Sequence, residues 1–268
     1  MPEQQNRACK YCGKVMTARA GWCDGVQKIR CGPCQNARKR KGYTKSVNRR
    51  ILFFTDVHWP HEHRHAFEFV NDIYSKWKCT EIICGGDLLD SAGWSTYTKD
   101  PDGMTGNQEV ELSIAMAEKW YTRWPEMNVC IGNHDYRANL RLAEAGLPSC
   151  FTKRFNDVLH LPDTWTFSEY YDIDNVRYFH GSKYGKTATI NYTLELGMSN
   201  VSGHQHANAG IFYVTNDRWR HFGVSSGCLI DTHSRAFAYG KDMTSRPVLG
   251  CTVILENGQL PIFEPMHL

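Results

Sequence analysis

Five short segments of this chain carry carboxylate, amide or imidazole side chains, and four of them directly follow an apolar, strand-like run. They are Asp56-Val57-His58, Gly86-Asp87, Gly132-Asn133-His134-Asp135, His180-Gly181 and Gly203-His204-Gln205-His206. A mixed set of oxygen and imidazole donors suits Mn²⁺, Fe, Zn²⁺ or Ni²⁺ better than Mg²⁺. We therefore expect the five segments to meet in one site for divalent metal ions.

The first two segments place carboxylates at the ends of predicted strands. Asp56 and His58 are two residues apart, so in an extended chain both point to the same side and can address one ion. A surface turn explains this pair equally well. Asp87 follows Gly85 and Gly86, which let the backbone turn sharply and bring a carboxylate close to a ligand. One carboxylate can bridge two ions, and the alternative for Asp87 is a turn or a helix cap.

The remaining segments add neutral donors. The amide oxygen of Asn133 can bind a metal, while His134 beside it can reach a leaving group. His180 ends a predicted strand, and His204 and His206 are again two residues apart, so both can face one site. A lone histidine is more often a core or surface residue. The occurrence of all five segments in this order favours a joint metal site.

With these motifs, residues 51–268 resemble the calcineurin-like metallophosphoesterase superfamily. The resemblance implies an α/β fold, a β-sandwich flanked by helices, and a centre for two divalent ions. It assigns one ion to Asp56, His58, Asp87 and His206, and the other to Asp87, Asn133, His180 and His204. Asp87 is then the bridging ligand, and His134 is the catalytic histidine that binds no metal.

The resemblance also implies a reaction. Two cations bind and activate a water between them for in-line attack on a phosphoester, and His134 protonates the departing oxygen. Asp90 is expected to orient His134, with Asp135 as the rival orienter or merely a helix cap. Mn²⁺ is the favoured metal by analogy of fold, and Fe, Zn²⁺ and Ni²⁺ are possible.

Departures from the family pattern narrow the substrate. Members that resemble Ser/Thr protein phosphatases carry Asp-Arg-Gly and Gly-Asn-His-Glu, whereas this chain has Asp90-Ser91-Ala92 and Gly132-Asn133-His134-Asp135. These differences argue against a protein phosphatase. The polar loop after Asp90 contains Trp94 and Tyr97, which could stack on a base or sugar as a wall for the substrate, although packing under the loop is the commoner fate of a tryptophan.

The elements that must position these segments follow from the hydrophobic pattern. Early strands alternate with amphipathic helices, and the last third is rich in short strands, which predicts two sheets packed face to face with helices outside. Expected strands cover 51–55, 81–84, 127–131, 177–180, 199–202, 210–215, 219–225, 249–255 and 260–263. Expected helices cover 64–77, 109–124, 136–145 and 187–196.

The N-terminal part carries a separate cysteine motif. Cys9, Cys12, Cys31 and Cys34 form a C-x2-C-x18-C-x2-C pattern, which is typical of a zinc ribbon with one structural Zn²⁺. Two disulfides are the alternative, and Cys23 is interpreted as a spare thiol. Five further cysteines lie within or beside apolar runs and are expected to be buried thiols: Cys79, Cys84, Cys130, Cys228 and Cys251.

Charge divides the chain as well. Residues 1–50 hold 13 Lys and Arg against two acids, whereas the remainder holds 18 against 26. The densest basic run contains Arg38, Lys39, Arg40, Lys41 and Lys45. Such a run can neutralise phosphates and predicts binding of nucleic acid, with a solvated linker or a protein-docking ribbon as alternatives.

We expect two domains, a zinc ribbon with a basic linker at 1–45 and a catalytic body at 46–268. The leading hypothesis is a two-metal phosphodiesterase or nuclease of a bacterial or phage-infected cell. The alternatives are a phosphomonoesterase or nucleotide phosphodiesterase whose ribbon binds a protein, and a non-catalytic adaptor. Because no apolar run approaches the ~20 residues that span a bilayer and the first residues are polar, we expect a cytoplasmic protein without a membrane partner.

Overall fold

The computed structural model describes residues 6–8, 15–17, 49–96, 101–233 and 246–267. Backbone contacts divide the chain into two units, Met1–Val47 and Asn48–Leu268. In the first unit, strands β1 (Asn6–Ala8) and β2 (Val15–Thr17) pair antiparallel, with Asn6 opposite Thr17. The four expected zinc ligands Cys9, Cys12, Cys31 and Cys34, and the basic run from Arg38 to Lys45, lie outside the described residues.

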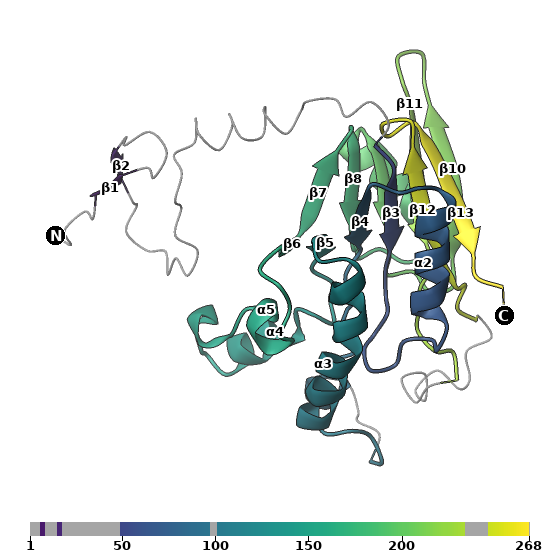
Figure 1. The fold of residues 1–268 in the computed structure, drawn as a ribbon. Helices are drawn as coiled ribbons and strands as arrows, with labels where there is room; N and C mark the ends of the chain where they lie inside the picture. Colours follow the sequence, from purple (N-terminus) through teal and green to yellow (C-terminus); the bar gives the residue numbers. More distant parts are fainter. Residues whose placement is uncertain (1–5, 9–14, 18–48, 97–100, 234–245, 268) are drawn as a thin grey trace. The chain divides into compact units, whose positions relative to one another are not determined.

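A six-stranded sheet forms the first layer of the second unit (Figure 1). Its order is β13 (Leu260–Pro265), β12 (Gly250–Leu255), β3 (Ile51–Phe54), β4 (Glu81–Cys84), β5 (Met127–Cys130) and β6 (Trp165–Ser168). Strands β3 to β6 pair in parallel, whereas β12 pairs antiparallel with β3 and with β13. All four residues of β3 are buried, as expected for a central strand that is covered on both faces.

A five-stranded sheet forms the second layer. Its order is β10 (Ala209–Thr215), β11 (Arg220–Ser226), β9 (Ser199–Ser202), β8 (Val176–Phe179) and β7 (Tyr170–Ile173). The β8–β9 and β9–β11 pairs are parallel, and the two outer pairs are antiparallel. This sheet packs against the six-stranded sheet through its inner face.

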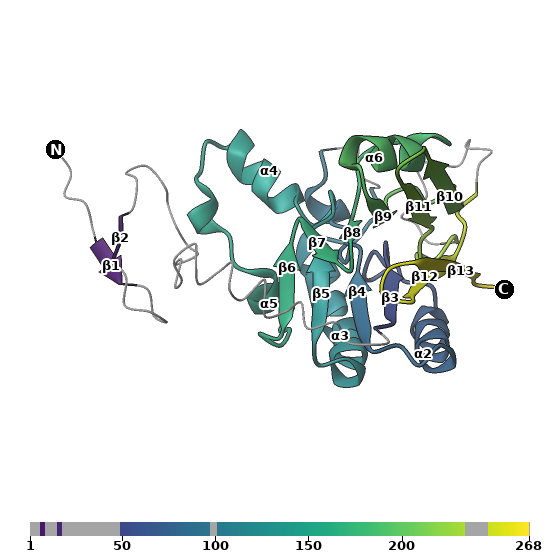
Figure 2. The same cartoon turned by 90° about the horizontal axis from the view of Figure 1, so that it is seen from above.

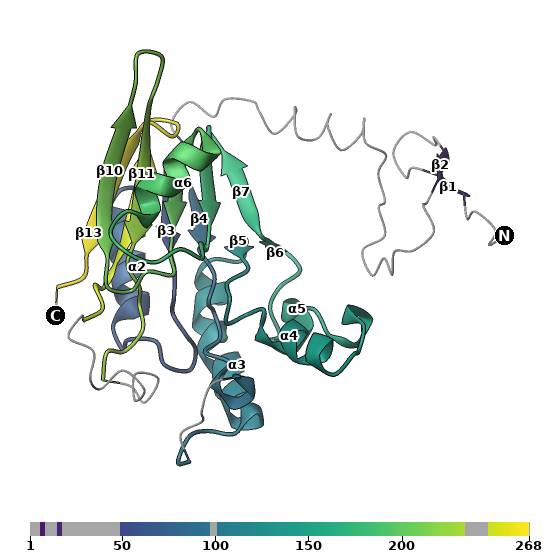
Figure 3. The same cartoon turned by 180° about the vertical axis from the view of Figure 1, so that it is seen from behind.

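Helices cover the outer faces of both sheets. Figure 2 shows α2 (Ala66–Lys76) and α3 (Gly106–Arg123) outside the six-stranded sheet. Helix α6 (Ala188–Leu196) lies outside the five-stranded sheet, as Figures 2 and 3 both show. The remaining helices are α4 (Arg137–Glu144), α5 (Phe155–Val158) and the 3-10 turns η1 (Ala92–Trp94) and η2 (Ser149–Phe151). The expected two sheets with helices outside are confirmed.

The alternation of side chains along β3 joins two hydrophobic cores. Leu52 and Phe54 point into the core under α2 and α3, whereas Ile51 and Phe53 point into the core between the two sheets. In that second core Phe53 lies against Tyr178 of the other sheet, with ring centroids 6.0 Å apart. The period of two residues in a strand is the reason that one segment serves both cores.

Strands β6, β7 and helix α3 differ from the sequence expectation. Strands β6 and β7 were not expected, because each has only four residues; both lie at a sheet edge, and most of their residues are at least partly exposed. Helix α3 begins at Gly106, three residues before the expected start. A capping box explains this, because Thr105 accepts a hydrogen bond from the Gln108 amide while the Gln108 side chain accepts one from the Thr105 amide.

The five expected buried cysteines, Cys79, Cys84, Cys130, Cys228 and Cys251, are buried and unpaired, and Cys150 is exposed. Among the described residues, no helix has both the length and the apolar character needed to cross a bilayer.

Candidate metal centre

The chain turns sharply where the predicted ligands follow their strands. Asp56, His58, Asp87 and His204 all have left-handed backbone, with φ values of 55°, 50°, 51° and 68°. This conformation is unfavourable for residues other than glycine, and such strain concentrates at functional sites. The backbones also approach so closely that a Cβ added at Gly132 would lie 2.1 Å from Asp87 Oδ1. The turns therefore bring distant loops into direct contact.

One group of donors surrounds Asp56. His206 Nε2 lies 3.0 Å from Asp56 Oδ1, and His58 Nε2 lies 3.7 Å from the same oxygen and 3.8 Å from Asp87 Oδ2. On the other side of its ring, His58 Nδ1 donates to Asp90 Oδ1 at 2.9 Å. That bond leaves the Nε2 lone pair facing the carboxylates, and Nε2 is buried without a hydrogen-bond partner among the described residues. A cation would satisfy this atom.

A second group of donors surrounds Asn133. His180 Nε2 lies 3.2 Å from Asp87 Oδ2 and 3.0 Å from Asn133 Oδ1. His204 Nδ1 lies 2.9 Å from the same amide oxygen and 3.3 Å from His180 Nε2. His180 Nδ1 donates to the backbone oxygen of Gly85 at 2.9 Å, which turns the lone pair of Nε2 toward the group. Asp87 Oδ2 thus contacts histidines of both groups, as a bridging carboxylate must.

All seven expected ligands, Asp56, His58, Asp87, Asn133, His180, His204 and His206, therefore converge. Asp56, His58, Asp87 and His180 are buried, whereas Asn133 is exposed and His204 and His206 are half-buried. The site consequently has a closed floor of carboxylates and an open side. The donors form three sets in which one ligand atom from each residue lies within 4.8 Å of the other two. These sets are Asp56-His58-His206, His58-Asp87-His134 and Asp56-Asp87-His180.

The electrostatics of the floor favour cations. Burial lowers the pKa of His58, but the neighbouring carboxylates, Asp56 and Asp90 foremost, outweigh burial and raise that pKa to about 10. Burial likewise opposes the charged form of His180, yet Asp87 and Asp56 raise its pKa to about 9. The negative potential that holds these protons is the potential that a divalent ion would neutralise instead.

His134 lies beside this floor. Its backbone amide donates to Asp87 Oδ1 at 2.8 Å, its Nδ1 donates to the backbone oxygen of Asp90 at 2.6 Å, and its Nε2 lies 4.0 Å from Asp87 Oδ2. Burial and the nearby His58 lower the pKa of His134. The imidazole is held at the edge of the site with Nδ1 protonated, because the backbone oxygen of Asp90 can only accept a hydrogen bond.

Asp90 contacts both rings that the site depends on. Its Oδ1 lies 2.9 Å from His58 Nδ1 and 3.4 Å from His134 Nδ1, so the carboxylate is closer to the expected ligand than to the expected acid. Burial raises the pKa of Asp90, but the hydrogen bonds from His134 and His58 leave it well below its usual range. Asp90 accordingly braces His58 by its side chain and His134 mainly by its backbone.

Asp135 has a different function from the two that the sequence suggested. Its oxygens accept hydrogen bonds from the backbone amides of Asp87 (2.8 Å), Leu88 (3.0 Å), Leu89 (3.2 Å) and Gly132 (3.0 Å). These bonds tie the loop after β4 to the loop after β5. Asp135 therefore positions the backbone around Asp87 rather than orienting the His134 ring or capping α4.

Sequence reasoning missed two further residues of the site. Arg137 Nη2 lies 2.8 Å from His134 Nε2, and the ring of Tyr184 lies 4.4 Å from the ring of His204. Arg137 begins α4 three residues after His134, and the turn between them, in which the Arg137 amide donates to the His134 backbone oxygen at 3.2 Å, brings the two side chains together. This short spacing could have signalled the contact. Nothing in the sequence pattern singles out Tyr184.

The expected substrate wall is described only in part, because Tyr97 lies outside the described residues. Trp94 is partly buried and packs against the core under α3, and two of its ring carbons lie within 3.3 Å of where a Cβ of Gly106 would be. This contact agrees with packing under the loop. A wall for the substrate stays a prediction for both residues.

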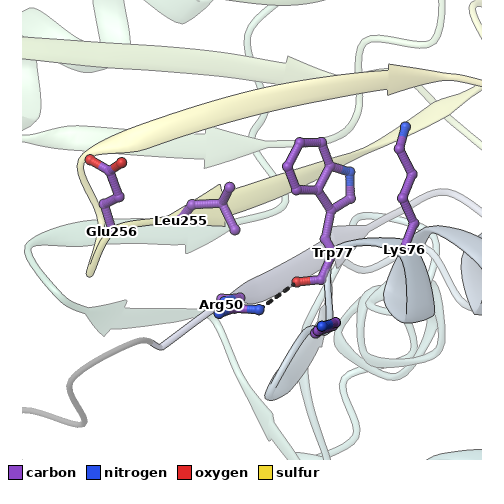
Figure 4. Close-up of a pocket in the computed structure, with 6 residues that line it drawn as sticks. Arg50, Lys76, Trp77, Leu255 and Glu256 are labelled. Carbon is purple, nitrogen blue, oxygen red and sulfur yellow. Dashed lines mark hydrogen bonds between the residues drawn. The ribbon is translucent and has the colours of Figure 1, made fainter.

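A cavity elsewhere in the second unit contains none of the predicted ligands. It has a volume of about 410 Å³ and lies at the amino end of β3 (Figure 4), whereas Asp56 follows the carboxyl end of that strand. Its lining consists of Arg50, Lys76, Trp77, Lys78, Leu255 and Glu256. Glu264 binds both the ammonium of Lys76 and the indole of Trp77, so part of this charge is already neutralised.

The part of the chain that carries the seven ligands matches a known protein family. The family model for calcineurin-like phosphoesterases matches residues 49–206, which is more than half of the chain and contains all seven converging ligands. The chain belongs to the calcineurin-like phosphoesterase family. A phosphoesterase of this family depends on divalent metal ions, and the orphaned Nε2 of His58 and the mixed oxygen and imidazole donors fit such ions.

Several solved structures are similar to this phosphoesterase. Vacuolar protein sorting 29 from Cryptosporidium parvum shares 10% identity over 82% of this chain and 98% of its own, with a TM-score of 0.44. Yfce, a phosphoesterase from E. coli, shares 13% identity over 80% of this chain and 98% of its own, with a TM-score of 0.34. The Pseudomonas putida nuclease MPE shares 13% identity over 81% and 87%, with a TM-score of 0.36. No curated protein matches the chain.

Proposed function

We propose that this phosphoesterase is a phosphodiesterase that cleaves nucleic acid. The observation that carries the proposal is the convergence of the seven expected ligands into one site. Among them the carboxylate of Asp87 is shared, with Oδ2 3.8 Å from His58 Nε2 and 3.2 Å from His180 Nε2. Asp56, His58, Asp87 and His206 would hold one ion, and Asp87, Asn133, His180 and His204 the other, with Mn²⁺ as the favoured metal. When bound, two such ions polarise the phosphoryl oxygens and lower the pKa of a water molecule.

The residues of the chain supply positioning and proton transfer. In the reaction the water oxygen would lose a proton to solvent and form a bond to phosphorus, and the bond from phosphorus to the leaving oxygen would break. That oxygen would take a proton from His134 Nε2, which must first be protonated by solvent because Nε2 accepts a hydrogen bond in this structure. His134 then has its initial protonation again, so the enzyme is unchanged at the end of a turnover. The bond from His134 Nδ1 to the Asp90 carbonyl holds the ring in the orientation that this transfer needs.

Two features support nucleic acid as the substrate. The basic run Arg38, Lys39, Arg40, Lys41 and Lys45 would attract phosphates without regard to sequence, and the four N-terminal cysteines would hold a structural Zn²⁺ beside it. In the body of the enzyme, the Tyr184 side chain is 75% exposed while its ring packs on the half-buried His204. An exposed aromatic ring beside the site offers a surface on which a nucleobase can stack.

The test compares hydrolysis of bis-p-nitrophenyl phosphate with that of p-nitrophenyl phosphate by the Mn²⁺-loaded protein. We expect cleavage of the diester, and a loss of about 100-fold or more in His134→Asn, since general acid–base catalysis contributes about 10²–10⁴-fold. His160→Asn is the matched control, because His160 is exposed and lies outside the site. Activity on the monoester alone would indicate a phosphomonoesterase, and inactivity with every divalent metal would indicate a non-catalytic adaptor.

A further inference from the structure

We propose that Arg137 is the substrate-binding arginine of this site, which exchanges its contact with His134 for a non-bridging oxygen of the phosphoryl group. The proposal rests on the proposed function, because it gives Arg137 a phosphoester to bind. Three observations support this role of Arg137: the position of the guanidinium, its hydrogen-bond partners, and its bond to Nε2 of His134.

The position follows from the local structure. Helix α4 begins at Arg137, directly after the loop that carries Asn133 and His134. Arg137 Nη1 donates to the backbone oxygen of Asp90 at 2.7 Å, and Nη2 donates to His134 Nε2 at 2.8 Å. The guanidinium therefore joins the loop after β4 to the loop after β5, and it contacts His134, the residue next to the expected ligand Asn133.

The partners of Arg137 are unusual for an arginine. Within the described part of the chain, no carboxylate lies within 4.0 Å of its guanidinium, whereas Arg141, Arg154 and Arg177 each pair with an acid at 2.8 Å. Its two partners are a carbonyl oxygen and a neutral imidazole, although the side chain is half-buried. A guanidinium has five N–H donors in a planar fork that matches phosphate oxygens, so this cation retains donors for an anion.

The carboxylates of the site do not satisfy this cation because other groups already bind them, and Glu109, whose pKa burial raises and the charge of Arg137 partly lowers, lies beyond ion-pair distance of it. Asp87 binds the amide of His134 and lies against His180, and Asp90 accepts from His58. Excess positive charge at the open rim, beside a floor of carboxylates, is the distribution expected for a site that admits a metal below and an anion above.

The contact with His134 also gives a reason for the exchange. Nδ1 of His134 donates to the Asp90 carbonyl while Nε2 accepts from Arg137, so both ring nitrogens are occupied. While Nε2 accepts a hydrogen bond from the guanidinium, it carries no proton for a leaving oxygen and cannot take one up from solvent. A phosphoryl oxygen carries negative charge and is a stronger acceptor for Arg137 than a neutral imidazole. Binding of the substrate would thus draw Arg137 away and free Nε2.

The experiment measures binding of inorganic phosphate, which needs no turnover, to the Mn²⁺-loaded full-length protein by calorimetry. Arg137→Met keeps an unbranched stem but removes the charge and all donors. We expect phosphate affinity to fall about 10- to 100-fold, as a lost hydrogen bond to a charged group implies, with a matching rise in KM for bis-p-nitrophenyl phosphate. Arg137→Lys keeps the charge without the planar fork, and we expect a smaller loss. Arg154→Met is the control, because Arg154 is exposed and pairs with Asp157.

A double variant separates binding of phosphate from mere orientation of His134. If Arg137 contacts the phosphate, Arg137→Met lowers phosphate affinity by the same factor in the His134→Asn background as in the wild type. If Arg137 acts only through His134, the effect disappears in that background and the proposal is wrong. Unchanged phosphate affinity in single variants that melt like the wild type would also overturn it.

Failure of the proposed function gives a different result. A wild-type protein that binds phosphate through Arg137 but hydrolyses no diester refutes the phosphodiesterase while the assignment of Arg137 stands. A protein that hydrolyses the diester equally well with methionine at this position retains the function and refutes the assignment.

Discussion

Replacement of Asp135 by asparagine tests whether one buried carboxylate holds the loops of the metal centre together. Asp135 is 4% exposed, and its two oxygens accept four backbone N–H groups from Asp87, Leu88, Leu89 and Gly132 at 2.8–3.2 Å. Asp135→Asn keeps the shape of the side chain but turns one acceptor into an NH₂ group. That group would face two N–H donors and leave both without a partner.

The magnitude follows from these contacts. Each hydrogen bond to a charged group contributes about 1.5–3 kcal/mol, so loss of two costs about 3–6 kcal/mol. Part of this loss is offset, because burial and the charge of Asp87 raise the pKa of Asp135 to about 6 and so disfavour its ionised form. We expect a net destabilisation of about 2–4 kcal/mol, which lowers Tm by roughly 5–15 °C for a unit of this size.

The assay is thermal unfolding of the metal-free protein in chelator, followed by titration with Mn²⁺. Asp157→Asn is the control, because Asp157 is exposed and its ion pair with Arg154 lies at the surface, so Tm should change little. We also expect weaker Mn²⁺ binding in Asp135→Asn alone, since the loop of Asp87 loses its support. A wild-type Tm together with wild-type Mn²⁺ affinity would refute this account of Asp135.

Other parts of the molecule give four further expectations. Glu62 accepts hydrogen bonds from the indoles of Trp59 and Trp120 at 2.7 and 2.9 Å and pairs with Lys119. Glu62→Ala should lower the free energy of unfolding by about 3 kcal/mol, and a wild-type midpoint in denaturant unfolding would contradict this. Removal of metal by EDTA should abolish hydrolysis, and Mn²⁺ should restore it; activity that persists after exhaustive dialysis against chelator argues against the metal centre. Tyr184→Ala should raise KM for a dinucleotide about 10-fold while Tyr184→Phe does not, and equal KM values in both variants would exclude stacking. Replacing all four basic residues at 38–41 by glutamine in the full-length protein should weaken DNA binding and make it less dependent on salt. An unchanged slope of log K against log salt concentration would show that this segment does not contact DNA.

Much of the metal centre could be predicted from the sequence because its signals are local. Asp56, Asp87 and His180 each follow an apolar run that must be a strand, and strand β4 was predicted to the residue, since its β-branched apolar run ends at the glycines before Asp87. The pairs Asp56/His58 and His204/His206 do meet in one site, but through turns with left-handed backbone rather than through the extended backbone that was expected. The strand ends thus depend on local pattern, whereas the turns do not.

Strands β6 and β7 could not be predicted in this way. Each has only four residues, too few for a periodic pattern, whereas the longer edge strands β10 and β13 were predicted. The zinc ribbon and the basic run stay predictions, because their residues lie outside the described parts of the chain.

By itself, the sequence determined the types of ligand, their order, and the strand ends that carry them. Only the tertiary structure decided which atom of each ring faces the shared Asp87, that Asp135 braces backbone amides, and that Arg137 rather than a carboxylate occupies His134 Nε2. The physical reason is that these choices depend on contacts between residues far apart in the chain, which exist only once two sheets have packed. A hydrogen bond on one ring nitrogen then determines what the other nitrogen can do.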